Sequence, residues 1–299
     1  MRTTMIRLAA VATMVLSLGS AAYAAEAEEG PTPHYPLKDP KHVAWSFGGP
    51  FGKFDPQQVQ RGFQIYKEVC SACHAMSMVA FRNLASPTGP KFTPEQVKSL
   101  AATYQITDGP DSSGAMFQRP GRASDYFPKP FPNEQAARAA NGGAYPPDLS
   151  LMAKARAVKR GFPTFLFDAF TQYQENGPDY IYSLLTGFQD PPAGVTVRPG
   201  LYYNPYFISG PALAMPPPLS DGLVKYAQNQ DDDKTNDVPE TVDQYAKDVA
   251  SYLMWAAEPH LTDRKRLGLN VMVFLIVLAG LLYYTKQRIW AYSPGEGAA

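Results

Sequence analysis

The apolar and polar positions of the chain follow helical spacing in several segments, which are separated by long irregular stretches. The clearest amphipathic helix is expected to begin at Asp55, an N-cap residue followed by Pro56 at the first helical position. Apolar residues then recur at steps of three and four, which places them on one helical face. That face contains Val59, Phe63, Tyr66, Cys70 and Cys73. The pattern predicts a helix that packs inward and ends in the two cysteines.

Weaker start and stop signals predict further helices along the chain. They cover residues 93–104, 133–140, 147–158, 162–173 and 178–186. A stronger helix begins at Thr241, with Gln244 where a capping box places it, and Pro259 should end or kink it. The stretches 107–132 and 189–218 are rich in turn-forming residues and are predicted to be loops. The expected fold class is therefore all-α, with a small helical core and long loops.

One segment near the C-terminus is apolar on all of its faces. Residues 267–284 contain no charged side chain, and basic residues flank both ends. A buried core helix is the alternative, but the basic flanks and the nearby aromatic residues favour a membrane span. We predict a single transmembrane anchor with its flanks at 259–290 and a cytoplasmic tail at 291–299.

The N-terminus has the composition of a signal peptide over residues 1–24. Arg2 and Arg7 accompany a short apolar stretch, and small residues at 22–24 form a cleavage site. The apolar stretch is shorter than the roughly 20 residues that span a bilayer. Export would orient the anchor and would place residues 25–258 on the periplasmic side of a bacterial inner membrane.

The charge balance excludes one class of partner. The chain has 27 Lys and Arg against 27 Asp and Glu, and loss of the signal peptide removes only Arg2 and Arg7. No basic footprint for nucleic acid remains. An acidic run at 231–240 is interpreted either as a solvated loop or as a docking site for a basic protein.

The candidate chemistry lies in Cys70-Ser71-Ala72-Cys73-His74, a C-x-x-C-H run that is the attachment signature of a c-type haem. On a helix these spacings place both sulfurs and the imidazole on one side. The chain has only these two cysteines. A redox disulfide and half of a zinc site are the alternatives, but zinc needs about four ligands and no second cluster is visible.

The second axial ligand would decide what such a haem does, because a sixth protein ligand favours electron transfer and an open position favours catalysis. Met76 and Met78 follow His74 too closely to reach the opposite face of the ring. The methionines on loops are Met116 and Met215, and three prolines that follow Met215 stiffen its strand. His34 and His42, in the N-terminal arm, are weaker alternatives.

Several longer motifs make a family resemblance specific. They are Arg119-Pro120-Gly121, Asp125-Tyr126-Phe127-Pro128-Lys129-Pro130, Ala137-Arg138-Ala139-Ala140-Asn141, Pro146-Pro147-Asp148-Leu149-Ser150, Tyr182-Ser183-Leu184-Leu185-Thr186-Gly187, Asn204-Pro205-Tyr206-Phe207 and Trp255-Ala256-Ala257-Glu258-Pro259. In this order, from about Val43 to Trp290, the chain resembles the cytochrome c1 family, the haem subunits of quinol:cytochrome c reductases.

The resemblance implies a class I cytochrome c-like domain with one covalent haem c. His74 and Met215 would be its axial ligands, and Cys70 and Cys73 its covalent anchors. Arg156 would pair with a haem propionate. The remaining pocket residues implied by the resemblance are Asn141, Pro146, Pro147, Tyr180 and Phe207. An insertion at 157–178, relative to mitochondrial members, separates Arg156 from Tyr180, and the extra cysteine pair of some bacterial members is absent.

The resemblance also implies partners. The chain would accept an electron from a Rieske iron-sulfur subunit and reduce a soluble or membrane-tethered cytochrome c, beside cytochrome b in a dimeric complex. It would be the electron-transfer subunit of the enzyme, with no independent substrate-turnover site. The haem motif and the anchor alone also permit an independent membrane-anchored cytochrome that feeds a terminal oxidase, or a haem enzyme with an open iron position.

Overall fold

The computed structural model describes residues 37–157, 162–163, 167, 176–227 and 237–291 of the 299-residue chain. The signal peptide expected at 1–24, His34, the acidic run at 231–233 and most of the helix expected at 162–173 lie outside the described residues. So does the tail at 291–299, except Ala291.

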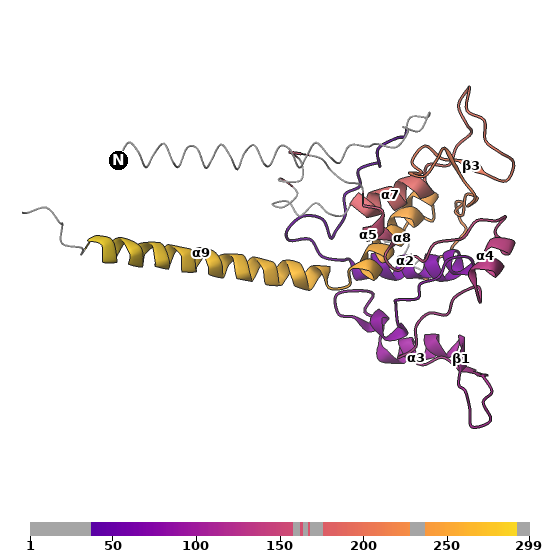
Figure 1. The fold of residues 1–299 in the computed structure, drawn as a ribbon, viewed down its shortest axis with the longest axis horizontal. Helices are drawn as coiled ribbons and strands as arrows, with labels where there is room; N and C mark the ends of the chain where they lie inside the picture. The colour runs from indigo at the N-terminus through magenta and orange to yellow at the C-terminus, as the bar shows by residue number, and fades with distance from the viewer. Residues whose placement is uncertain (1–36, 158–161, 164–166, 168–175, 228–236, 292–299) are drawn as a thin grey trace, which may run out of the picture. The chain divides into compact units, whose positions relative to one another are not determined.

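Helices dominate the described part of the chain (Figure 1). In chain order the elements are α2 (Pro56–Glu68), η1 (Cys70–Ala72), η2 (Phe81–Ala85), α3 (Pro94–Ala102), β1 (Gln105–Asp108), β2 (Phe117–Pro120), α4 (Glu134–Ala140), α5 (Met152–Ala155), α7 (Asn176–Leu185), β3 (Tyr202–Tyr203), β4 (Ala212–Leu213), α8 (Val242–Ala257) and α9 (Leu261–Ala291). The short strands pair antiparallel as β1–β2 and β3–β4. The helix-rich fold expected from the sequence is confirmed.

The core forms where α2 packs on α8, with α5 and α7 against α8 (Figure 1). Gly62 allows the close approach of α2 and α8, because a Cβ at this position would lie 2.0 Å from the Asp248 carbonyl oxygen. Aromatic side chains fill the space around the two helices. The Phe81 and Phe127 ring centroids are 4.4 Å apart, and Tyr252 stacks on Trp255 at 5.7 Å.

A buried carboxylate links the same two helices. The Asp248 side chain is fully buried and accepts hydrogen bonds from Arg61 Nε at 2.7 Å, Tyr226 Oη at 2.8 Å and Gln244 Nε2 at 2.8 Å. A charge in a protein interior is tolerated when it is paired and hydrogen-bonded in this way. The segment that carries Tyr226 is thereby tied to α8.

Local signals predicted several helix starts correctly. Asp55 caps α2, and the side chains of Thr93 and Gln96 form both bonds of a capping box at α3. Thr241 accepts from the Gln244 backbone at the start of α8, and α8 ends two residues before Pro259.

Among the expectations that the structure contradicts, two concern residues 107–158. The helix expected at 147–158 is reduced to α5, because Asp148 and Leu149 bond to residues 75–77 instead of starting a helix. The loop expected at 107–132 begins inside a β-hairpin, where the Arg119 guanidinium pairs with Asp108 and, at 2.6 Å, with Asp125.

Helix α9 is long and apolar enough to cross a membrane. Its 31 residues correspond to about 46 Å at 1.5 Å per residue, more than the roughly 30 Å of a bilayer core. The side chains of its apolar segment are exposed and do not pack against the described part of the domain. These properties fit the single C-terminal anchor predicted from the sequence.

Candidate haem-binding site

The C-x-x-C-H run lies immediately after α2, on a 3₁₀ turn and not on the helix itself. Helix α2 ends at Glu68, and η1 begins at Cys70. The backbone N–H groups of Cys73 and His74 both donate to the Cys70 carbonyl, at 3.1 and 2.9 Å. Cys73 follows the turn directly, and its charge contributes to raising the pKa of the Cys70 thiol, so the two thiols lie near each other. The expected helix extension was wrong, but the expected juxtaposition of the cysteines is retained.

The two thiols differ in environment. Cys70 is partly buried, and burial raises the pKa of its thiol to about 12, so that the sulfur stays protonated at neutral pH. Cys73 is exposed. Neither cysteine is in a disulfide.

His74 is oriented by a backbone carbonyl. Its Nδ1 lies 2.8 Å from the Pro147 oxygen. A carbonyl oxygen only accepts, so Nδ1 carries the proton and Nε2 carries the lone pair. Burial lowers the pKa of His74 despite this hydrogen bond, which favours the neutral ring. A neutral imidazole with a free Nε2 is the form that binds a metal.

The segment that supplies this carbonyl is held by a small network that sequence reasoning missed. Asp148 accepts from the Ser77 N–H at 3.0 Å, the Ser77 hydroxyl at 2.6 Å and the Ser150 N–H at 2.8 Å. Burial opposes the charge of Asp148, but the hydrogen bonds from Ser150 and Ser77 lower its pKa overall. The Leu149 N–H donates to the Ala75 carbonyl at 2.8 Å. Ser150, two residues after Asp148, was the only local sequence signal for this clamp, because Ser77 lies 71 residues away.

Arg156 and Tyr180, two further residues predicted for the haem site, interact electrostatically. Tyr180 is buried, and burial raises its pKa, while a hydrogen bond with the Ile208 backbone and the charge of Arg156 act in the opposite direction. Arg156 caps the end of α5 and is half-buried. The structure therefore brings these two predicted residues together although the insertion at 157–178 separates them in sequence.

Phe207 lies within a short hairpin, and Met215 follows the hairpin. Strands β3 and β4 pair Tyr202 with Leu213, and they enclose the loop that contains Phe207. The Asn204 side chain ties this loop to the Leu184 carbonyl of α7 at 2.7 Å. Met215 follows β4 by two residues and is half-buried.

Asn141 and Pro146 lie on the segment after α4. The Asn141 amide donates to the Ala137 carbonyl at 2.7 Å, so its side chain closes its own helix. Pro146 lines a hollow of about 110 Å³ together with Cys73, Lys129 and Tyr145. Among the described residues, no hydrogen bond or ion pair links Cys70, Cys73 or His74 to Met215.

The alternative ligands are less suitable. Met116 is 59% exposed next to β2, and Met78 is also exposed. His42 is exposed beside the Asp179 carboxylate, 3.4 Å from one of its oxygens. In the described ranges no group of three or more His, Cys, Asp or Glu side chains could hold a metal ion.

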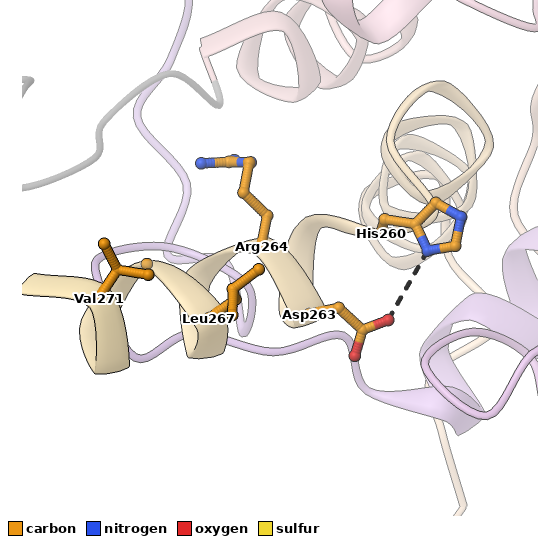
Figure 2. A pocket seen from close by; sticks show the side chains of 6 residues that line it. His260, Asp263, Arg264, Leu267 and Val271 are labelled. Carbon is orange, nitrogen blue, oxygen red and sulfur yellow. Dashed lines mark ion pairs between the residues drawn. The ribbon is translucent and has the colours of Figure 1, made fainter.

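A larger hollow, of about 580 Å³, lies at the start of α9. Figure 2 shows His260 paired with Asp263 there, and Arg264, Leu267 and Val271 along the helix. None of the predicted haem residues lines it.

The donor set fits a c-type haem. Two thiols lie at and directly after one 3₁₀ turn, and the adjacent imidazole is neutral with its proton on Nδ1. A half-buried thioether precedes three prolines, and the half-buried Arg156 guanidinium interacts with Tyr180. Thiols can anchor a porphyrin covalently, imidazole and thioether bind haem iron, and a guanidinium pairs with carboxylates.

Comparison with known proteins gives a consistent match. The profile of the Cytochrome C1 family covers residues 45–293. The chain is 56% identical over 289 residues to "Cytochrome b/c1" of Bradyrhizobium diazoefficiens, covering 96% of this chain and 40% of that protein. It is 45% identical to "Cytochrome c1" of Blastochloris viridis, and the match covers 95% of this chain and 96% of that protein. It is 44% identical to "Cytochrome c1-2, heme protein, mitochondrial" of Solanum tuberosum, covering 92% of each.

Proposed function

The chain belongs to the cytochrome c1 family, and on this basis we propose that it is the haem-bearing electron-transfer subunit of a quinol:cytochrome c reductase, the bc1 complex. The observation that carries the proposal is the C-x-x-C-H turn beside a neutral imidazole whose Nδ1–H is held by the Pro147 carbonyl. Family members carry one covalent c-type haem, which supplies one-electron redox chemistry when bound.

The residues of the chain have distinct proposed roles toward this group. Cys70 and Cys73 form its thioether bonds, and His74 and Met215 are its axial ligands. Arg156 compensates the charge of a propionate. The proposed lining residues are Asn141, Pro146, Pro147, Tyr180 and Phe207. The neutral state of His74, the three prolines after Met215 and the burial of Tyr180 support these assignments.

The partners follow from the family. As a cytochrome c1, the chain acts in electron transfer within the bc1 complex, together with cytochrome b. We propose that a Rieske iron-sulfur subunit is its donor and that a soluble or membrane-tethered cytochrome c is its acceptor, in a dimeric complex. The turnover of quinol then takes place outside this chain.

The anchor supports a location. The chain is a membrane-anchored protein by its family and by its apolar C-terminal helix. We propose that residues 1–24 are a signal peptide, that 25–258 form a periplasmic haem domain, and that 259–290 and 291–299 are the anchor and a cytoplasmic tail.

Purification of the full chain from membranes in mild detergent tests the function. We expect covalent haem c to co-purify with cytochrome b and to become reduced when quinol is added. Haem c that purifies without cytochrome b and is not reduced by quinol would support the independent tethered cytochrome instead.

A further inference from the structure

One exposed aromatic side chain lies on a loop that is bonded to the start of the anchor helix. Phe51 is 77% exposed. Lys265, in the second turn of α9, donates from Nζ to the Phe47 carbonyl at 2.5 Å and to the Gly49 carbonyl at 2.6 Å. Lys265 is itself buried. The loop that carries Phe51 is therefore fixed to α9 at the position of Lys265.

The loop is closed by a backbone hydrogen bond and follows a tight path. The Lys53 N–H donates to the Ser46 carbonyl at 3.0 Å, which closes the loop. A Cβ at Gly52 would lie 2.1 Å from the Gly48 oxygen, and Gly49 has a φ of +68°, so the tight path requires both glycines. At the base, the Phe47 ring is buried and packs on Phe54 at 5.0 Å. Only the tip projects outward.

The loop is bonded to α9 next to the start of the apolar segment, where a membrane surface is expected. Lys265 precedes Leu267, the first residue of the apolar segment, by two positions, which is about 3 Å along a helix. Leu267 is 65% exposed. On another face of α9, the hollow in Figure 2 is lined by Arg264 and then by Leu267 and Val271, so the side chains of α9 change from charged to apolar within two turns. Lys265, which bonds the loop, directly follows Arg264 and precedes the apolar side chains that begin at Leu267.

The residues near the tip suit a lipid surface. Pro50 and Phe51 are exposed, and Lys53 and Arg266 are exposed cations on the loop and on α9. Aromatic side chains are favoured at the boundary between headgroups and acyl chains, and cations pair with lipid phosphates.

We propose that residues 49–53 form a second membrane contact, in which Phe51 inserts into the headgroup region of the bilayer and Lys53 faces lipid phosphates. The domain is then held at the membrane by two elements, α9 and this tip. The inference rests on the membrane anchoring of the chain and not on the proposed electron transfer.

Spin labels on the full-length haem protein test this contact. Single cysteines are introduced as Phe51→Cys, Met116→Cys and Ile276→Cys, and the chain without an added cysteine controls for labelling of Cys70 or Cys73. Met116 is exposed on the β1–β2 hairpin, and Ile276 is exposed on α9. Each labelled protein is reconstituted into vesicles of phosphatidylcholine and phosphatidylglycerol. Collision rates of the label with oxygen, which concentrates in lipid, and with a water-soluble nickel chelate are then measured.

We expect the oxygen-to-nickel ratio at position 51 to exceed that at position 116 several-fold in vesicles, and to lie below that at position 276. Equal ratios at 51 and 116, with a lipid-exposed label at 276, would overturn the second contact and leave the anchor intact. A water-exposed label at 276 would overturn both. A label at 51 that is shielded only in the purified bc1 complex and not in vesicles would also overturn the proposal, because a partner protein would then cover the tip.

Discussion

At the scale of single residues, the proton on His74 is placed by a group that carries no charge and does not titrate. The Pro147 carbonyl fixes the ring and leaves Nε2 free, and the position of this carbonyl depends on Asp148. A carboxylate in the same place would make the imidazole a stronger donor. The neutral acceptor therefore orients the ligand while adding little electron density to it.

Exchange of the proposed sixth ligand tests the site directly. We expect Met215→Leu to retain covalent haem, to bind carbon monoxide when reduced, and to have a midpoint potential lower by on the order of 200 mV, since thioether ligation raises the potential. At 59 mV per tenfold change, this is more than a thousandfold in the equilibrium constant for accepting an electron. Redox titration and carbon monoxide difference spectra measure both effects.

The matched control is Met116→Leu, which removes an exposed methionine from a loop. It should leave the potential and the carbon monoxide spectrum unchanged. A normal potential in Met215→Leu combined with a lowered one in Met116→Leu would reverse the assignment.

The Asp148 clamp gives a prediction about pH. Because the folded pKa of Asp148 is lowered, its contribution to stability is present above its unfolded pKa, about 3.9, and is lost as the pH falls through the folded value. Asp148→Asn should lower the free energy of unfolding by about 1–2 kcal/mol at pH 7, as expected for weakened hydrogen bonds to a charged acceptor. Guanidinium unfolding at several pH values measures this difference, which should shrink below about pH 4.

Asp39→Asn, at an exposed position, is the control and should leave stability nearly unchanged. A penalty for Asp148→Asn that is equally large at low pH would mean that the carboxylate charge is not responsible.

At the scale of elements, local and long-range signals differ in what the sequence reveals. The capping box at Thr93 and Gln96 is a local feature, and it was read correctly. The helix expected at 147–158 failed because Asp148 bonds to Ser77, a partner 71 residues away that no local pattern encodes. The β1–β2 hairpin was missed because its strands are four residues long and mostly exposed, and its Arg119 pairs are visible only in three dimensions.

The same distinction applies to the candidate site. The C-x-x-C-H spacing predicts Cys70, Cys73 and His74 as haem-binding residues from a local pattern alone, because the five residues are consecutive in the chain. Tyr180 and Arg156 could be named only through the family resemblance, since their proximity depends on how α5 and α7 pack. The assignments of Met215 and of the lining residues remain predictions.

The contact between α2 and α8 predicts a severe effect at Gly62. Gly62→Ala would place a Cβ 2.0 Å from the Asp248 oxygen and 2.6 Å from the Tyr252 Cβ. We expect destabilisation by about 3 kcal/mol, at the upper end of ordinary overpacking. Thermal unfolding followed by the haem absorbance is the measurement.

Gly268→Ala is the control, because this glycine also lies in a helix but has open space where a Cβ would be. It should unfold at the temperature of the parent protein. Equal effects of the two substitutions would mean that α2 and α8 separate more easily than the structure indicates.

At the scale of the whole molecule, the anchor begins inside the domain. Leu261 is fully buried in the core and Lys265 is bonded to the 47–49 loop, although the sequence predicted a domain boundary after residue 258. The first turns of α9 therefore have two roles, one in the core of the haem domain and one as the lead into the apolar segment.

Two truncated chains test this dual role. Chains that stop after Glu258 or after Arg266 should both be exported with covalent haem and should not need detergent, because the proposed haem ligands precede both ends. The longer chain should be more stable by about 3 kcal/mol, since it retains the buried Leu261 side chain. Guanidinium unfolding compares them, and equal midpoints would show that the start of α9 contributes nothing to the domain.

The short connection between α8 and α9 has an optical consequence. Only Glu258, Pro259 and His260 separate the two helices, and the Glu258 carboxylate bonds to both Lys154 and Arg264. A domain joined in this way cannot tumble independently of its anchor. The plane of the haem should therefore keep a fixed angle to the membrane, so that oriented membrane films would show linear dichroism in the haem absorption bands.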